Sequence, residues 1–200
     1  MKESMEFGTW QGHPLEWLII NEDSESLILW CKQAVAKMAF SENKSAFYAE
    51  SDVRRFLEGE FFENAFSSDE KARILKTEID CTEYQTYYGA VGVGASAYRR
   101  EPLCDRVFLL SIREIMKTYA LTNEDIFHKD CGFLWTRSPE SHSSVSLVYC
   151  SAGILRGEDP YTYESRSYDH TTGMVDSTTF PYSGFANNIS SVIPAVKIKK

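Results

Sequence analysis

The order of apolar and polar positions along the chain predicts strands first, then helices, then strands again. Two strand-like runs, Glu16–Ile20 and Ser26–Trp30, flank the acidic, polar segment Asn21–Glu25, and this pattern predicts a β-hairpin. Large aromatic side chains at strand positions are core residues far more often than sugar-stacking platforms. Trp17 and Trp30 are therefore predicted to be buried, structural residues.

Further along, the apolar period changes to that of a helix. Over positions 53–66 the apolar residues recur at three- and four-residue intervals, which predicts an amphipathic helix with a break near Gly59. Ser67 and Glu70 then match a capping box, in which a serine hydroxyl and a glutamate carboxylate satisfy backbone donors at a helix start. A second helix is predicted to begin with Ser67 as its cap and to end at about Thr77.

Glycine and tyrosine are frequent in the following segment, 82–102, and predict a mobile loop. Its glycines fit neither a dinucleotide fingerprint nor a phosphate-binding loop. A strand is predicted at Arg106–Leu110, with Phe108 in the core. A second capping box follows, in which Ser111 is the cap of a further helix and Glu114 is its partner.

In the stretch Gly132–Pro139, aromatic and aliphatic residues surround one cation and end at a proline. This composition predicts a buried strand that contains Trp135 and is terminated by Pro139. Arginine is seldom buried without a partner, so Arg137 is predicted to be clamped by a carboxylate or by backbone carbonyls. The alternative makes Arg137, together with Trp135, a ligand contact at the mouth of a loop-built pocket.

After Pro139 the composition shifts to serine, threonine, tyrosine, glycine and asparagine. Strands are predicted at Val145–Tyr149 and Ser191–Ile198, with a turn at Tyr182–Gly184. The long polar segment Arg156–Asn188 lies between them; loops of this length are uncommon without a function, and its residue types are those of adaptable binding surfaces. The predicted ligand-binding residues of this segment are Tyr161, Tyr163, Tyr168, His170 and Asn187.

Charge and cysteine content narrow the range of partners. The formal net charge of −8 disfavours nucleic acids and anionic membranes. The five cysteines are odd in number and scattered, so no disulfide framework is expected.

The chain as given shows no apolar signal region or membrane-spanning run, which predicts a cytoplasmic protein. The terminal lysines, Lys197, Lys199 and Lys200, are predicted to keep an edge strand soluble.

Candidate chemistry is sparse. His128 and Cys131 could ligate zinc, yet only His142 and Cys150 could complete the four ligands that such a site needs. A cysteine nucleophile paired with His128 or His142 has no local activating group, and no Gly-x-Ser-x-Gly elbow occurs. We therefore expect no catalytic residue, no metal and no cofactor.

Several short motifs spread over most of the chain support a family assignment. They are Phe7-Gly8, Glu16-Trp17, Val53–Leu57, Asn64–Phe66, Val107–Ser111, the Trp-x-Arg-Ser-Pro signature at Trp135–Pro139, and a terminal strand that starts with Pro194-Ala195. In combination they resemble a bacterial family, the domain of unknown function 6273 family. Its members commonly end in Val-Arg-Pro-Ala-Leu, whereas this chain has Ile193 before a structural Pro194, so the resemblance implies no site built from two arginines.

The predicted layout is similar to the C-type-lectin-like fold, and this resemblance implies an architecture without implying an activity. We expect one α+β domain over 1–200: an N-terminal β-hairpin region (1–50), a mainly helical region (51–130) and a small antiparallel C-terminal sheet with long polar loops (131–200). The motifs that bind sugar through calcium in C-type lectins are absent, so calcium-dependent sugar binding is not expected.

The leading hypothesis is a non-catalytic module that binds a small molecule, a glycan or a protein through its C-terminal polar and aromatic loops. The alternatives are an enzyme with a pocket near Arg137 and a His or Cys, and a structural or interaction subunit. Convergence of His128, His142, His170 and Cys131 on one cleft would favour catalysis, whereas dispersal would favour binding.

Overall fold

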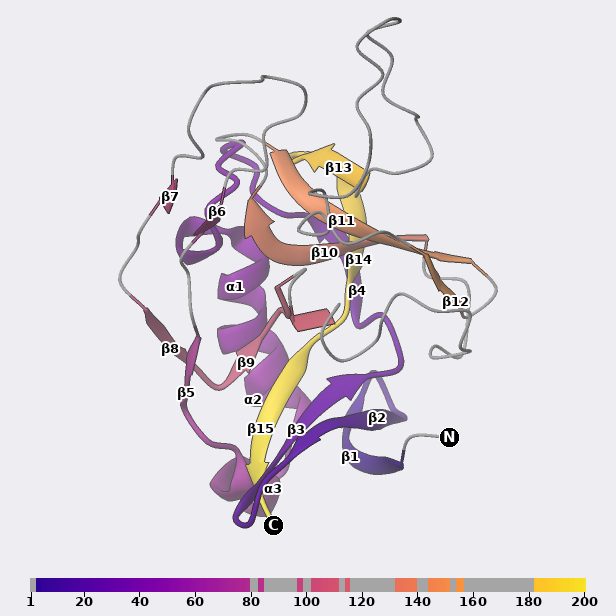
Figure 1. Cartoon of the computed structure of the whole chain (residues 1–200). Coiled ribbons are helices and arrows are strands. Elements are labelled where there is room, and N and C mark those ends of the chain that lie inside the picture. The colour runs from indigo at the N-terminus through magenta and orange to yellow at the C-terminus, as the bar shows by residue number, and fades with distance from the viewer. Residues whose placement is uncertain are drawn as a thin grey trace, which may run out of the picture.

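A central helix lies against two β-sheets, and its two ends contact different sheets (Figure 1). The computed structural model describes residues 3–79, 83–84, 97–98, 102–111, 114–115, 132–139, 144–151, 154–156 and 182–200. These elements form a single α+β domain, as the sequence predicts.

The first sheet has five strands in the order β1–β2–β3–β15–β9. Their bounds are Ser4–Trp10 for β1, His13–Glu22 for β2, Ser26–Cys31 for β3, Ala195–Lys199 for β15 and Val107–Phe108 for β9. The antiparallel pairing of β2 with β3 confirms the predicted hairpin. β1 extends this hairpin to a third strand, with an irregularity between Glu6 and Thr9 that includes Gly8.

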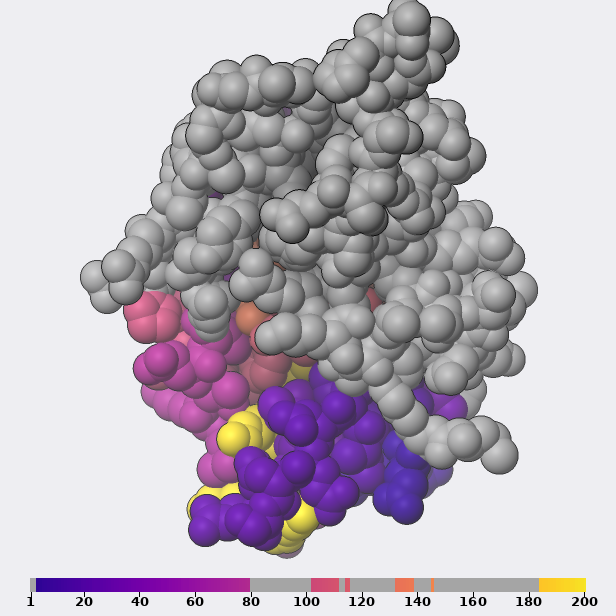
Figure 2. Space-filling model, viewed as in Figure 1, coloured from indigo at the N-terminus to yellow at the C-terminus, as the bar shows by residue number. Residues whose placement is uncertain are grey.

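The terminal strand β15 lies inside the first sheet. It pairs with β3 along its length and with β9 at its start. Beyond β9, Ile74 bridges Ile198, and the Leu75 amide donates to the Lys197 carbonyl (2.8 Å). The prediction that the terminal lysines protect an edge strand is therefore wrong, because both edges of β15 are paired. Figure 2 shows the last residues (yellow) at the surface between residues of the first strands and of the helical part.

The central helix is continuous. It comprises α1 (Asp52–Phe56), the π-helical turn η2 (Leu57–Phe61) and α2 (Phe62–Ala65), preceded by the 3₁₀ turn η1 (Tyr48–Glu50). The break predicted near Gly59 is wrong, because Gly59 lies inside the π turn and its carbonyl accepts the Phe62 amide. A single widened turn accommodates the glycine and keeps the backbone hydrogen-bonded. Ser51 caps this helix by accepting the Arg54 amide (3.0 Å).

The next helix, α3 (Ser68–Arg73), starts at the predicted capping box. The Ser67 hydroxyl accepts the Glu70 amide (3.3 Å), and a Glu70 carboxylate oxygen accepts the Ser67 amide (2.8 Å). The helix is shorter than predicted, because Ile74 adopts extended backbone and bridges the terminal strand. Thr77, the predicted end, belongs to a strand.

The second sheet has six strands, with the path β12–β11–β10–β14–β4 and with β13 paired to β11. Their bounds are Ile154–Arg156 for β12, Ser144–Ser151 for β11, Gly132–Pro139 for β10, Ile189–Val192 for β14, Ala36–Ala39 for β4 and Tyr182–Phe185 for β13. Two features correct the predicted small antiparallel C-terminal sheet: β10 and β14 are parallel, and β4 comes from the N-terminal part of the chain. The turn predicted at Tyr182–Gly184 is also wrong, because these residues pair with β11 as a strand.

Two small sheets form successive parts of one hairpin between α3 and β9. β5 (Thr77–Ile79) pairs with β8 (Leu103–Asp105), and β6 (Glu83–Tyr84) pairs with β7 (Ala97–Tyr98). The predicted loop 82–102 thus contains a short paired segment, and its other residues except Pro102 lie outside the described part. The strand predicted at Arg106–Leu110 is limited to the two residues of β9.

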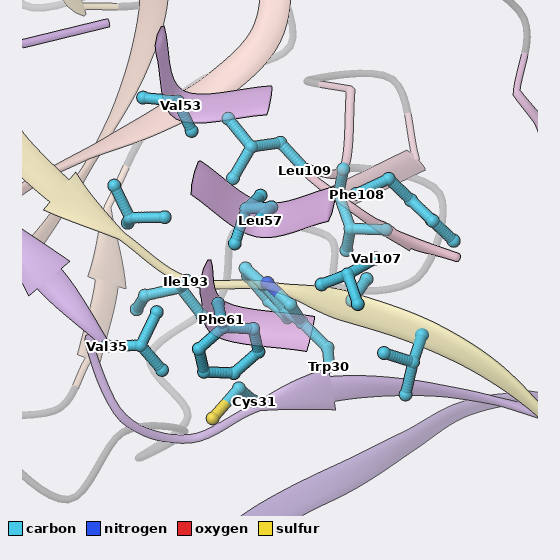
Figure 3. Close-up of a cluster of buried hydrophobic side chains, with 14 of the residues drawn as sticks. Trp30, Cys31, Val35, Val53, Leu57, Phe61, Val107, Phe108, Leu109 and Ile193 are labelled. Carbon is cyan, nitrogen blue, oxygen red and sulfur yellow. The ribbon is translucent and has the colours of Figure 1, made fainter. Parts of the chain in front are cut away.

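One apolar core joins both sheets and the helix. Figure 3 shows Trp30, Phe61 and Phe108, from three different elements, within this core. Trp17, Trp30, Phe108 and Trp135 are all buried in it, as predicted. Ile193 is 2 % exposed and packs there too. No helix in the described ranges has the length and apolar character needed to span a membrane.

Candidate functional site

The cation of β10 is held by a forked clamp. Arg137 is 3 % exposed, and its Nη1 donates to the Leu109 carbonyl (2.6 Å) and to one Glu114 oxygen (2.5 Å). Its Nη2 donates to the other Glu114 oxygen (2.7 Å). The planar guanidinium is suited to this geometry, because it presents several donors in a fixed arrangement. Both kinds of partner that the sequence predicts, a carboxylate and a backbone carbonyl, are therefore present.

The carboxylate of this clamp is fixed by the second capping box. The Glu114 amide donates to the Ser111 hydroxyl (3.2 Å), and the Ser111 amide donates to a Glu114 oxygen (2.7 Å). The Ile115 amide donates to the Ser111 carbonyl (3.1 Å) and continues the helical turn. One glutamate thus caps its own helix and neutralises Arg137, so the helix start and β10 are tied together.

Trp135 joins β10 to the edge of the second sheet. Its indole Nε1 donates to the Met38 carbonyl of β4 (2.9 Å). The centroids of the Trp135 and Phe40 rings are 5.4 Å apart. The pairing of β10 with β11 is irregular between Trp135 and Pro139, and Thr136 and Arg137 in this stretch are both buried. Trp135 and Arg137 are both occupied by contacts within the domain.

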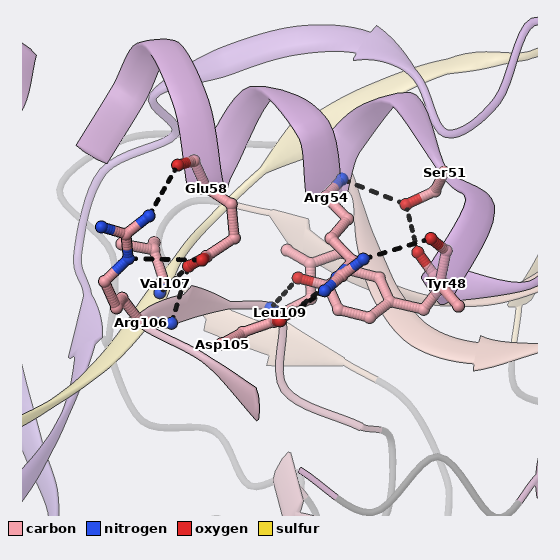
Figure 4. A network of polar contacts seen from close by, with 9 residues as sticks. Tyr48, Ser51, Arg54, Glu58, Asp105, Arg106, Val107 and Leu109 are labelled. Carbon is pink, nitrogen blue, oxygen red and sulfur yellow. Dashed lines mark hydrogen bonds and ion pairs between the residues drawn. The ribbon is translucent and has the colours of Figure 1, made fainter. Parts of the chain in front are cut away.

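Side chains of the central helix hold the chain between β8 and the Arg137 clamp (Figure 4). Arg54 binds Asp105 with two hydrogen bonds, Nε to Oδ2 (2.8 Å) and Nη2 to Oδ1 (2.7 Å). The Asp105 side chain is fully buried, and that of Arg54 is 29 % exposed. The hydrogen bonds that Arg54 donates to Asp105 raise the pKa of Arg54, so the guanidinium stays charged and holds β8 to α1.

Two further side chains, Tyr48 and Glu58, extend this network in both directions. The buried Tyr48 hydroxyl accepts the Leu109 amide (3.3 Å). Burial, together with the negative charge of Asp105, raises the pKa of Tyr48, so the phenol is neutral. Glu58, which projects from the π turn, accepts the backbone amides of Arg106 (2.6 Å) and Val107 (2.8 Å). The hydrogen bonds of these groups are made within the domain. The network therefore has a structural role, which is to hold the chain from Asp105 to Leu109 against the helical part.

The exposed turn, Phe185–Ile189, connects β13 with β14. Unlike the buried polar network, it presents side chains to solvent. Phe185 is 62 % exposed and Ile189 is 73 % exposed. Ala186 between them is fully buried, and its carbonyl accepts the Ser41 amide (2.8 Å). The backbone is anchored, whereas two large apolar side chains and the two asparagines of the turn face solvent.

The predicted ligand-binding residues divide into three groups. Trp135 and Arg137 lie together, buried in β10, and Asn187 lies in the exposed turn. The others, Tyr161, Tyr163, Tyr168 and His170, lie outside the described residues. His128, His142 and Cys131 also lie outside the described residues, so whether they converge on one cleft stays a prediction.

The two prolines assigned structural positions lie at strand ends. Pro139 is the last residue of β10. Pro194 is buried between β14 and β15, and its carbonyl accepts the Cys31 amide (2.9 Å). Cys31 is buried, and its thiol donates to the side-chain oxygen of Gln33 (3.7 Å), whereas Cys104 on β8 is exposed. Within the described ranges, no three His, Cys, Asp or Glu residues form a group that could hold a metal ion.

The described residues form a single α+β domain with an internal ion-pair scaffold and an exposed apolar turn. The chain belongs to the family described as Domain of unknown function (DUF6273), whose model matches residues 16–200. The matched range includes the Arg137 clamp and the exposed turn. No curated protein and no solved structure matches the chain. The C-type-lectin-like relation stays a prediction.

Proposed function

We propose that this domain is a non-catalytic binding module, and that the exposed turn together with the polar segment before it forms the binding surface. The ligand classes are those compatible with a polar, partly aromatic surface: a small molecule, a glycan or a protein. Nucleic acids and anionic membranes are disfavoured, because the chain carries a net charge of −8.

The observation that carries this proposal is the rigid presentation of apolar side chains to solvent. Phe185 and Ile189 are largely exposed on either side of the buried Ala186. The turn is closed by a hydrogen bond from the Asn188 amide to the Phe185 carbonyl (2.8 Å). Clustered exposed apolar residues mark interaction sites more often than isolated ones do, and a backbone that is already ordered loses little entropy on binding.

The proposed surface extends into the segment before the turn. Tyr161, Tyr163, Tyr168 and His170 belong to it through composition alone, because tyrosine provides rigid amphipathic contact area. A C-type-lectin-like layout is part of the same proposal. It is supported by the order of elements, in which the helices precede β10 to β13 of the second sheet, and the segment lies between β12 and β13.

The engagement of Arg137 argues against the enzyme alternative. Its two terminal nitrogens already bind Glu114 and the Leu109 carbonyl, and only 3 % of the residue is exposed. A ligand could reach the guanidinium only by displacing Glu114, which would leave the charge of the buried Arg137 without this partner, and that is costly. Arg137 and Trp135 therefore support the surface from inside rather than contact the ligand.

The test is a screen of the purified chain against a glycan microarray and a library of short random peptides, followed by the double variant Phe185→Ala/Asn187→Ala. A ligand selected by the parent should bind the double variant at least about tenfold more weakly, a loss of about 1.4 kcal/mol. Calorimetry or fluorescence anisotropy measures the dissociation constants.

Asn64→Ala is the matched control, because Asn64 is an exposed asparagine on the central helix. This variant should bind like the parent, and all variants should melt near the parental temperature. Substitution of Tyr161, Tyr163 or Tyr168 should likewise change binding and leave stability near parental. Selected ligands that bind the double variant as tightly as the parent would overturn the proposal.

A further inference from the structure

We draw no further inference here: the strongest candidate, the exposed apolar turn Phe185–Ile189 between β13 and β14, already belongs to the proposed binding surface, and nothing among the described residues shows which partner covers it.

Discussion

Gly8 in β1 has a backbone φ of +76° and no room for a side chain. A Cβ at this position would lie 2.7 Å from the Ala65 carbonyl oxygen and 2.7 Å from the Phe66 ring. Left-handed backbone costs a residue with a side chain about 1–2 kcal/mol, and overpacking adds roughly 1–3 kcal/mol. Gly8→Ala is therefore expected to lower the free energy of unfolding by both contributions, as measured by urea denaturation.

Gly12 offers a control that separates these two contributions. Its φ is +81°, yet no atom lies within 4 Å of a Cβ built there. Gly12→Ala should therefore lose only the conformational part. Equal losses for the two variants would show that the close approach of Gly8 to Ala65 and Phe66 has no energetic consequence.

Arg137→Lys is expected to lower the free energy of unfolding by roughly 1–3 kcal/mol. Arg137 makes three hydrogen bonds in the clamp, two to Glu114 and one to the Leu109 carbonyl. A lysine ammonium is a point charge and cannot reproduce this fork. Thermal melting followed by circular dichroism gives the change.

Arg55→Lys provides the corresponding control on the surface, because the Arg55 side chain is 62 % exposed in its ion pair with Asp52. Exposed ion pairs contribute about 0–1 kcal/mol, so this variant should melt near the parental temperature. If Arg137→Lys also melts like the parent, the clamp does not stabilise the fold.

For the polar network, the sequence predicts the type of partner that a residue needs but not which residue provides it. The sequence indicates that Arg137 needs a carboxylate or a carbonyl, but the actual partners are 23 and 28 residues away along the chain. Arg54 and Asp105 are 51 residues apart. Local patterns contain no signal for such pairs, because long-range packing decides which side chains meet.

At the scale of elements, starts are more predictable than ends. A capping box spans four residues of sequence, and both predicted boxes form. The end of α3 depends instead on Ile74, which pairs with a strand at the opposite end of the chain. The π turn has a tertiary basis as well, since it carries the Glu58 carboxylate that holds β9.

Ser67→Ala should lower the free energy of unfolding by about 0.5–2 kcal/mol. The variant removes the hydroxyl that accepts the Glu70 amide at the start of α3. Glu70 also accepts the Gly8 amide (2.7 Å), so a looser cap weakens the contact between α3 and β1. Urea denaturation of the parent and the variant measures the difference.

Ser68→Ala is the neighbouring control, because Ser68 is exposed in the first turn of α3. Alanine has a higher helix propensity than serine, so this variant should be as stable as the parent or slightly more stable. A loss at Ser68 equal to that at Ser67 would contradict the capping role.

At the scale of the whole molecule, the two ends of the chain meet in one sheet. β15 pairs with β3, from which it is separated by most of the chain, and also with β9. β4, from the N-terminal part, joins the second sheet. The sequence predicts most of these strands singly, yet apolar periodicity does not specify which strands are neighbours. The division into an N-terminal hairpin and a separate C-terminal sheet therefore could not anticipate how the strands are shared.

Because the strands are shared in this way, the domain should unfold as one cooperative unit, and Phe108 tests this expectation. Phe108 is 2 % exposed in β9, where it pairs with Ala195 of β15 and belongs to the common core (Figure 3). Phe108→Ala should cost roughly 3–5 kcal/mol, with far- and near-ultraviolet circular dichroism changing together in urea. Phe185→Ala, at a position that is 62 % exposed, should change stability by less than about 0.5 kcal/mol. Two separate transitions, or a Phe108→Ala variant as stable as the parent, would show that β9 is not part of a single core.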